Sequence, residues 1–299
     1  MKSSSLLTLA VGAALISSAT ATVTIDWVTV GNAGNAADTT GYGAVSYNYQ
    51  IGKYEVTNAQ YAEFLNAKAA TDSYNLYNAT YMASYGITRS GGSGSYTYAV
   101  ASGMENRPVV YVSWFDAARF SNWMANGQGN GDTETGSYTL NGATSGIITA
   151  NVGATIYIPT EDDWYKAAYY NGATSTYSLY PNGQNSITTA DANYGSSLGS
   201  STNVGTYSGD PSSYGTFDQG GNVWEWNDAV SGSSRGLRGG SWYGDENFLA
   251  SSYRNYRFST PTVESLDIGF RLTSVAVPEP SSLVLTMLAS GVVLMRRKR

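Results

Sequence analysis

Three segments of the chain share one pattern of apolar and polar positions. Each has a short stretch that is apolar or alternates between apolar and polar residues, then Ser or Thr, then Asp or Gln three residues later, and then apolar residues at every third or fourth position. The runs occupy residues 47–56, 109–112 and 156–158, and the pairs after them are Thr57 with Gln60, Ser113 with Asp116 and Thr160 with Asp163. A hydroxyl residue followed three positions later by an acidic or amide residue is the capping box that starts a helix. The pattern therefore predicts three units, each a strand followed by a helix.

The predicted helices are amphipathic, and the rest of the body is rich in turns. The expected apolar stripes are Tyr61, Phe64 and Leu65 beside Lys68, then Ala117, Phe120, Trp123 and Met124, then Trp164, Ala167 and Ala168. Gly127 and the pair Asn171-Gly172 are expected to end the second and third helices. Loops are expected at 88–97 and 126–136, short strands at 236–242 and 268–273, and no long helix between 173 and the C-terminal segment. The body is therefore predicted to be mixed α+β with a high irregular content.

Both ends of the chain carry targeting patterns. Residues 1–21 combine Lys2, an apolar stretch at 6–16 and the small-residue site Ala19-Thr20-Ala21, which is typical of a secretory signal peptide. Residues 278–299 combine Pro278-Glu279-Pro280, an apolar run and four terminal basic residues that are expected to stay on the cytoplasmic side. As a helix, the apolar run would span roughly 22 Å against about 30 Å of bilayer hydrocarbon.

This C-terminal order resembles the PEP-CTERM sorting signal. The resemblance implies a bacterial cell-envelope or extracellular protein, held transiently in the membrane by its tail until an exosortase-type enzyme cuts the tail. A plain C-terminal membrane anchor is the alternative. In either case the body between the two signals, residues 22–277, is long enough for one large domain.

The composition excludes several classes of function. Five of the 16 basic residues and one of the 22 acidic residues lie in the two terminal signals, so the body carries 11 against 21 and a net charge near −10. Such a body is not expected to bind nucleic acid or an anionic membrane. The chain has neither cysteine nor histidine. This excludes disulfides, serine–histidine and cysteine–histidine catalysis, and zinc sites of the usual nitrogen and sulfur kind.

Six motifs, taken in order, resemble the sulfatase-modifying-factor family, to which the formylglycine-generating enzymes belong. They begin at Ile51 (IGKYEVTN), Arg107 (RPVVYVSWFDA), Ile158 (IPTEDDW), Gly220 (GGNVWEW), Arg238 (RGGSW) and Gly269 (GFR). The resemblance covers residues 26–273 and implies an irregular, loop-rich variant of the C-type-lectin-like fold. It also implies that the catalytic chemistry is lost, because family members that bind copper do so through two cysteines, and Gly244 and Leu249 stand at the matching positions. No copper is therefore expected, and the histidines that hold iron in the relatives of the ergothioneine pathway are missing too.

The resemblance leaves calcium as the expected structural cofactor, since calcium needs only oxygen ligands. It implies one site that uses backbone oxygens near Gly220, Gly221 and Val223 with the Glu225 carboxylate. A second, weaker site would begin at Asn193 and the carbonyl of Tyr194. The alternative is that residues 220–226 form only a tight turn that packs two tryptophans.

The remaining polar and aromatic residues leave two functions open. Arg238, Arg254 and Arg271 are expected to fix loops rather than clamp a ligand, and the six tryptophans from Trp114 to Trp242 are expected in the core. Exposed Trp or Tyr at 73–98 and 243–263 are better candidates for ligand contacts. The favoured function is a non-catalytic envelope module that binds an unidentified peptide, glycan or neighbouring polymer. The alternative is an enzyme that modifies exported proteins or small molecules by a mechanism without cysteine, with Asp116, Glu161 or Asp163 as acid or base.

Overall fold

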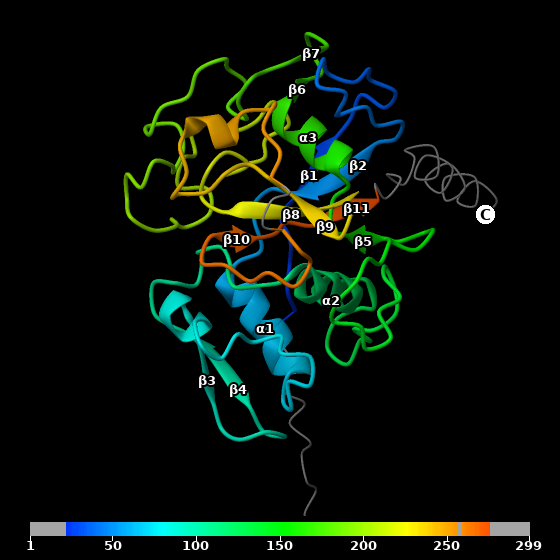
Figure 1. Ribbon diagram of the computed structural model, residues 1–299, viewed down its shortest axis with the longest axis vertical. Helices are drawn as coiled ribbons and strands as arrows, with labels where there is room; N and C mark the ends of the chain where they lie inside the picture. Colours follow the sequence, from blue (N-terminus) through cyan, green and yellow to red (C-terminus); the bar gives the residue numbers. More distant parts are fainter. Residues whose placement is uncertain (1–21, 256–258, 276–299) are drawn as a thin grey trace, which may run out of the picture.

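The computed structural model describes residues 22–255 and 259–275 (Figure 1). The predicted signal peptide and sorting signal lie outside the described residues. Within the described part, no helix combines the length and the apolar composition needed to cross a bilayer.

The three helices begin where the capping boxes predict them. They are α1 (Asn58–Lys68), α2 (Trp114–Ala125) and α3 (Glu161–Tyr169). In each, the hydroxyl of the cap residue accepts from the backbone N–H three positions on, and the Gln or Asp side chain there accepts from the cap residue's N–H. Two of the backbone donors left free at each helix start are thus satisfied locally, which explains why sequence alone located these boundaries.

Helices α1 and α2 pack together through aromatic rings. The ring of Phe64 lies 5.3 Å from Phe120 and 5.3 Å from Trp123, and Phe120 lies 5.5 Å from Phe270 in an edge-on arrangement. These four side chains are buried, as the apolar stripes predict, whereas Lys68 is partly exposed. Edge-on and tilted contacts of this kind add about 0.5–1.5 kcal/mol per pair beyond the burial of apolar area.

A four-stranded antiparallel sheet joins the two ends of the described chain. Its order is β1 (Trp27–Val30), β2 (Tyr49–Gly52), β11 (Thr273–Val275) and β5 (Ile156–Tyr157). Strand β11 therefore lies between β2 and β5, and Thr273 of β11 pairs with Ile51 of β2 and with Tyr157 of β5.

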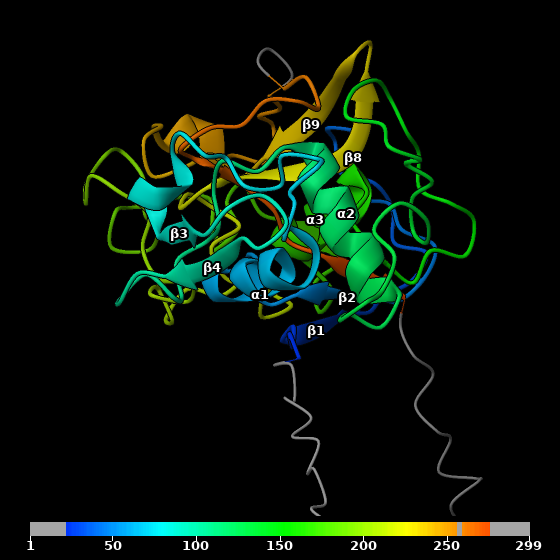
Figure 2. The same cartoon turned by 90° about the horizontal axis from the view of Figure 1, so that it is seen from below.

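A second sheet carries residues of the motifs that begin at Gly220, Arg238 and Gly269. It consists of the hairpin β8 (Trp224–Ser231) and β9 (Ser234–Arg238), with β10 (Ile268–Gly269) parallel to β8. The two sheets run through the middle of the molecule, with α1 and α2 on one side and α3 on the other (Figures 1 and 2). Smaller elements are the pairs β3 (Ile87–Ser90) with β4 (Thr97–Val100) and β6 (Tyr170–Asn171) with β7 (Thr176–Tyr177), and the 3₁₀ helices η1 (Met82–Tyr85) and η2 (Glu246–Leu249).

Several predicted strands and loops were wrong in detail. Residues 109–112 are buried but form no strand, because Tyr111 has a left-handed backbone (φ 58°). The predicted strand at 236–242 starts earlier and ends at Arg238, since Gly239 and Gly240 also have positive φ. The loop expected at 88–97 contains most of β3 and the start of β4. The longest strand, β8, was missed because residues 224–227 are all buried and show no alternation.

The capping carboxylate of α2 gives a pH-dependent contribution to stability. Asp116 is buried and accepts from both the backbone N–H and the hydroxyl of Ser113 at 2.7 Å. Burial, with a smaller contribution from the charge of Glu264, raises the pKa of Asp116 to about 7. The folded protein therefore holds a proton that the unfolded chain releases near pH 4, and stability falls as pH rises from about 4 to 7.

We expect Asp116→Asn to flatten this decline, because asparagine cannot titrate but can still accept from Ser113. The measurement is the free energy of unfolding in urea at pH 4.5, 6 and 7.5. Asp132→Asn is the control, since Asp132 is exposed and hydrogen bonding to Thr135 lowers its pKa below this window. An equal slope in the wild type and in Asp116→Asn would contradict the assignment.

Candidate functional site

A glycine turn places the start of β8 against the loop that carries Asn193. Gly221 has a φ of 82°, and a Cβ atom there would lie 2.2 Å from the carbonyl oxygen of Asn193. The N–H of Asn222 donates to that same oxygen at 2.9 Å, and the N–H of Gly221 donates to Gly239 at 2.9 Å. Only glycine permits this approach, so the turn brings the Asn193 loop against the residues that lead into β8.

Glu225 is fully buried, and both of its oxygens accept hydrogen bonds. Arg271 donates from Nε to Oε2 and from Nη2 to Oε1, both at 2.6 Å, and the indole N–H of Trp164 donates to Oε2 at 2.7 Å. Neither side chain of the ion pair is exposed to solvent. The remaining donors of Arg271 bind the carbonyls of Gly52 and Phe217 at 2.9 Å. The guanidinium group of Arg271, which is fixed by these hydrogen bonds, thus neutralises the charge of Glu225.

Two further carboxyl groups lie close to this pair. Burial, followed by the charges of Asp218 and Glu225, raises the pKa of Glu55 well above its usual range. Burial likewise raises the pKa of Asp218 to about 6. Glu55 Oε1 accepts from Asn222 Nδ2 at 3.0 Å, whereas its Oε2 is buried with no partner among the described residues. One arginine cannot offset three charges, so Glu55 is expected to be protonated at neutral pH.

The residues predicted to bind calcium are brought together, but they fit a cation unequally. The Oδ1 atom of Asn193 is buried without a partner among the described residues, which suits a metal ligand. The carbonyl of Tyr194 accepts from Ser197 at 3.2 Å. Glu225 does not fit, because Arg271 holds both carboxylate oxygens. Gly220 and Val223 are buried beside it, and no group of three acidic side chains suited to a metal occurs in the described part. Calcium binding stays a prediction.

Apolar packing fills the region around Gly244 and Leu249, the two positions that the resemblance matches to copper-binding cysteines. Leu249 is fully buried in η2, and its Cδ1 atom would lie 2.6 Å from a Cβ atom at Gly240. Beside Gly244, the ring of Phe248 leaves no space, since a Cβ atom there would lie 2.4 Å from its Cδ2. The Phe248 ring also packs at 5.8 Å from Trp224. No polar side chain replaces the missing thiols at these positions.

An open groove lies next to this packed region, and we call it the Trp242 groove. It has a volume of about 240 Å³, and its walls are Ser84, Tyr85, Met104, Arg107, Pro108, Val110, the segment 199–201 and Trp242. Arg107 donates to the hydroxyl of Ser200 at 3.2 Å. Trp242 is therefore not a core residue, contrary to expectation, although the other five tryptophans singled out are buried.

Tyrosines extend the Trp242 groove at its rim. Tyr85 packs edge-on against Tyr111 at 5.0 Å, and Tyr111 stacks on Tyr81 at 4.7 Å. Tyr81 is 49% exposed, and Tyr243, whose ring lies 5.6 Å from Trp242, is 69% exposed. Tyr81, Tyr85 and Tyr243 lie in the segments 73–98 and 243–263, where the sequence predicted the better candidates for ligand contacts, whereas Tyr111 lies outside both. Arg107 was missed as a candidate, although it begins the second family-like motif.

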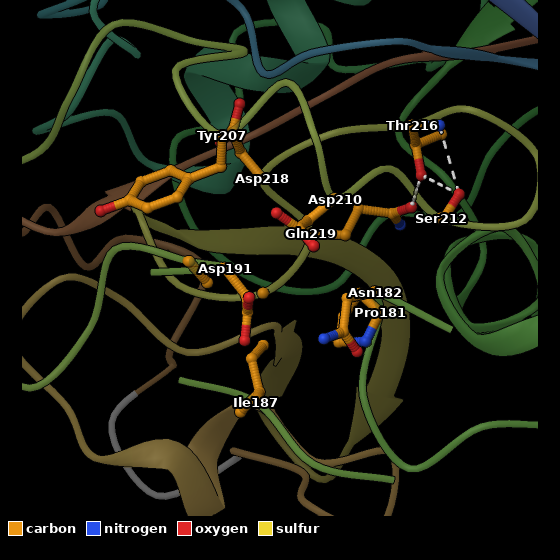
Figure 3. A pocket seen from close by; sticks show the side chains of 12 residues that line it. Pro181, Asn182, Ile187, Asp191, Tyr207, Asp210, Ser212, Thr216, Asp218 and Gln219 are labelled. Carbon is orange, nitrogen blue, oxygen red and sulfur yellow. Dashed lines mark hydrogen bonds between the residues drawn. The ribbon is translucent and has the colours of Figure 1, made fainter. Parts of the chain in front are cut away.

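A smaller polar pocket lies between the loops 181–191 and 207–220 (Figure 3). The carboxyl groups of Asp191 and Asp210 point towards its centre, while Ser212, Thr216 and Gln219 hydrogen-bond to one another at one side. Its volume of about 20 Å³ holds a water molecule or a single ion and excludes an organic ligand.

The arginines and helix-start carboxylates have structural partners. Glu161 lies 2.7 Å from Arg238 and accepts from Arg254 Nε at 2.6 Å, so both arginines fix the start of α3. Asp163, like Asp116, accepts from the cap residue of its own helix. The structural role predicted for the arginines is confirmed, and none of the three carboxylates lines the Trp242 groove.

Comparisons with known proteins agree with this architecture. The model of the family "Sulfatase-modifying factor enzyme 1-like domain" matches residues 24–276. A hercynine oxygenase of Mycobacterium tuberculosis is 25% identical over 236 residues, which are 70% of this chain and 48% of that protein. A hercynine oxygenase of Mycolicibacterium thermoresistibile is 27% identical over 175 residues, 50% of this chain and 32% of that protein. The chain thus spans half or less of these relatives.

Two solved structures share the fold. Treponema denticola variable protein 1 aligns with a TM-score of 0.60 at 22% identity, over 87% of this chain and 98% of that one. CarF aligns with a TM-score of 0.57 at 24% identity, over 85% and 99%. These similarities confirm the predicted loop-rich α+β fold of the C-type-lectin-like kind.

The buried carboxylates allow a matched pair of substitutions. We expect Glu225→Gln to cost about 3–5 kcal/mol, because it removes the carboxylate charge to which Nε and Nη2 of the buried Arg271 donate. Glu55→Gln should cost about 1 kcal/mol or less, since burial and the neighbouring charges favour the neutral form of Glu55 and glutamine keeps an acceptor for Asn222. Urea unfolding at pH 7, followed by circular dichroism, measures both. A Glu225→Gln protein that fails to fold agrees with the expectation, whereas equal costs for the two variants would contradict it.

Proposed function

The chain belongs to the family of sulfatase-modifying factor enzyme 1-like domains, and we propose that it is an exported, non-catalytic member that binds a peptide, a glycan or another cell-envelope polymer. The observation that carries the proposal is the pair of positions 244 and 249. A glycine and a fully buried leucine stand there, with the Phe248 ring packed beside them. This environment offers no ligand to a transition metal.

The side chains available as metal ligands in the whole chain also support a non-catalytic role. Copper and non-haem iron in oxidases and oxygenases are held chiefly by thiolate and imidazole groups. The chain has neither cysteine nor histidine. An oxygenase activity like that named for the mycobacterial relatives would have to use a metal bound by oxygen atoms alone.

The Trp242 groove supports a binding role. It combines an indole, tyrosine rings, serine hydroxyls and the guanidinium of Arg107, which together offer stacking surfaces and hydrogen-bond donors. Aromatic rings with polar tips bind at a low cost in conformational entropy. At about 240 Å³ the groove suits one sugar ring or one side chain of a longer polymer.

Export rests on the sequence of the two ends. The signal peptide at 1–21 and the tail at 278–299 would send the body out of the cytoplasm, with the tail either cut by an exosortase-type enzyme or kept as an anchor. A body of net charge near −10 would not adhere to anionic lipid. Since the chain has no cysteine, ion pairs and side-chain packing must stabilise the exported domain without disulfides.

A second candidate function is catalysis without cysteine, and it is favoured by the names of the curated relatives. The two candidates differ in their need for metal. The test measures oxygen uptake by the purified protein with hercynine or a cysteine-containing peptide as substrate. Uptake that depends on added copper or iron would support the enzyme. The same rate of oxygen uptake with and without the metal would support the binding module.

Glycan and peptide arrays test the binding function. We expect the exported body to bind at least one class of ligand, and Trp242→Ala and Arg107→Ala each to weaken that binding roughly tenfold or more, as for other central aromatic and arginine contacts. Val152→Ala is the control, because Val152 is fully exposed and lies outside the groove. Equal binding by all three variants would assign the ligand to another surface, and no binding across broad arrays would count against the function itself.

We also propose one structural calcium, with Asn193 Oδ1 as a ligand. An ion that binds only the folded state stabilises it by about 2.7 kcal/mol at a hundredfold excess over its Kd. Excess chelator should therefore lower the Tm of the wild type and of the exposed control Asn130→Ala, but not that of Asn193→Ala. Identical melting curves of the wild type with calcium and with chelator would refute the site.

A further inference from the structure

A second groove lies at the end of the four-stranded sheet, and we call it the Val275 groove. Its volume is about 260 Å³, and its lining includes Tyr47, Ala154, Tyr157, Thr160, Asp228 and Val275. It shares no residue with the Trp242 groove. Tyr157 comes from β5, the outermost strand, and Val275 from β11 beside it, so the groove lies where the last strand of the described chain ends.

Two tyrosine rings give this groove a fixed aromatic wall. The hydroxyl of Tyr47 donates to Asp163 Oδ1 at 3.0 Å, which fixes its ring although the residue is 44% exposed. Tyr157 is buried in the register of β5 with β11. Burial raises the pKa of both hydroxyls, so the wall stays uncharged at neutral pH. Grooves lined by aromatic rings are surfaces on which proline-rich segments dock.

The sequence places prolines within reach of this wall. Val275, which itself lines the groove, is 44% exposed, and the chain continues from it as Ala276-Val277-Pro278-Glu279-Pro280. Three residues span at most about 11 Å and five at most about 18 Å. A segment tethered this closely has an effective concentration in the millimolar range, so a weak contact suffices to dock it.

We propose that the Val275 groove binds the Pro278-Glu279-Pro280 segment of the same chain. Proline favours the left-handed extended helix with three residues per turn, in which three consecutive side chains point in three directions. Two proline rings can then pack on the tyrosine wall while Glu279 points to solvent. The opposite orientation would bring Glu279 towards Asp228, which is already paired with Arg235 at 2.7 Å, and like charges repel.

This docking goes beyond the proposed ligand binding and does not depend on it. It would hold the tail against the body next to the site where the tail is expected to be processed. The groove would then act as a shield for the segment rather than as a receptor for an outside ligand.

Disulfide cross-linking in the full chain, held in detergent, tests the proposal, because the native chain contains no cysteine. The variant Ala154→Cys with Ser281→Cys places one thiol in the groove wall and one beside the prolines. We expect a fast intramolecular disulfide whose rate does not depend on protein concentration. Adding Pro278→Ser and Pro280→Ser should slow it at least tenfold, since the tether remains but the contact is lost.

Tyr243→Cys with Ser281→Cys is the matched control, because Tyr243 is exposed beside the other groove. Its cross-linking should be slow with or without the prolines. Equal rates with prolines and with serines at 278 and 280 would overturn the proposal by showing that only the tether matters. Disulfide-linked dimers would overturn it too, because they would assign the groove to the tail of a second copy.

Discussion

The rest of the structure depends on the buried ion pair of Arg271 and Glu225. Arg271 donates to the carbonyl of Gly52 at the end of β2 and to the carbonyl of Phe217, while Glu225 at the start of β8 also accepts from Trp164 of α3. Four segments far apart in sequence are thus joined at one point. A buried pair gives little net stability against an apolar alternative, but removing one partner is costly, so the pair specifies how these segments meet. It does this in a chain that has no disulfides.

Other buried arginines form ion pairs with carboxylates elsewhere in the domain. Arg119 pairs with Glu134, Arg235 with Asp228, and Arg238 with Glu161, and each of these three arginines is buried. Glu134 lies in a loop, Asp228 lies at the bulge of β8, and Glu161 begins α3. Because loops make up most of the chain between 173 and 223, such contacts give them the order that regular hydrogen-bond ladders give to a sheet.

Two grooves are open on the surface of the domain. Leu249 and the Phe248 ring fill the space around Gly240 and Gly244, and an open surface lies at Trp242. The Val275 groove lies elsewhere, beside β5 and β11 at one edge of the four-stranded sheet. A ligand in the first and the chain's own tail in the second would occupy separate parts of one domain.

The sequence by itself determined the helix starts, the fold family and the absence of cysteine and histidine. It could do so because capping is decided within four residues, as at Ser113 and Asp116, and because composition needs no coordinates. Only the tertiary structure decided that Glu225 meets Arg271, 46 positions away, and that Trp242 lines a groove. It also decided that residues 109–112 form no strand, through the left-handed backbone of Tyr111. These outcomes depend on which distant segments pack together, and local patterns of apolar and polar residues carry no information about the partner of a buried charge.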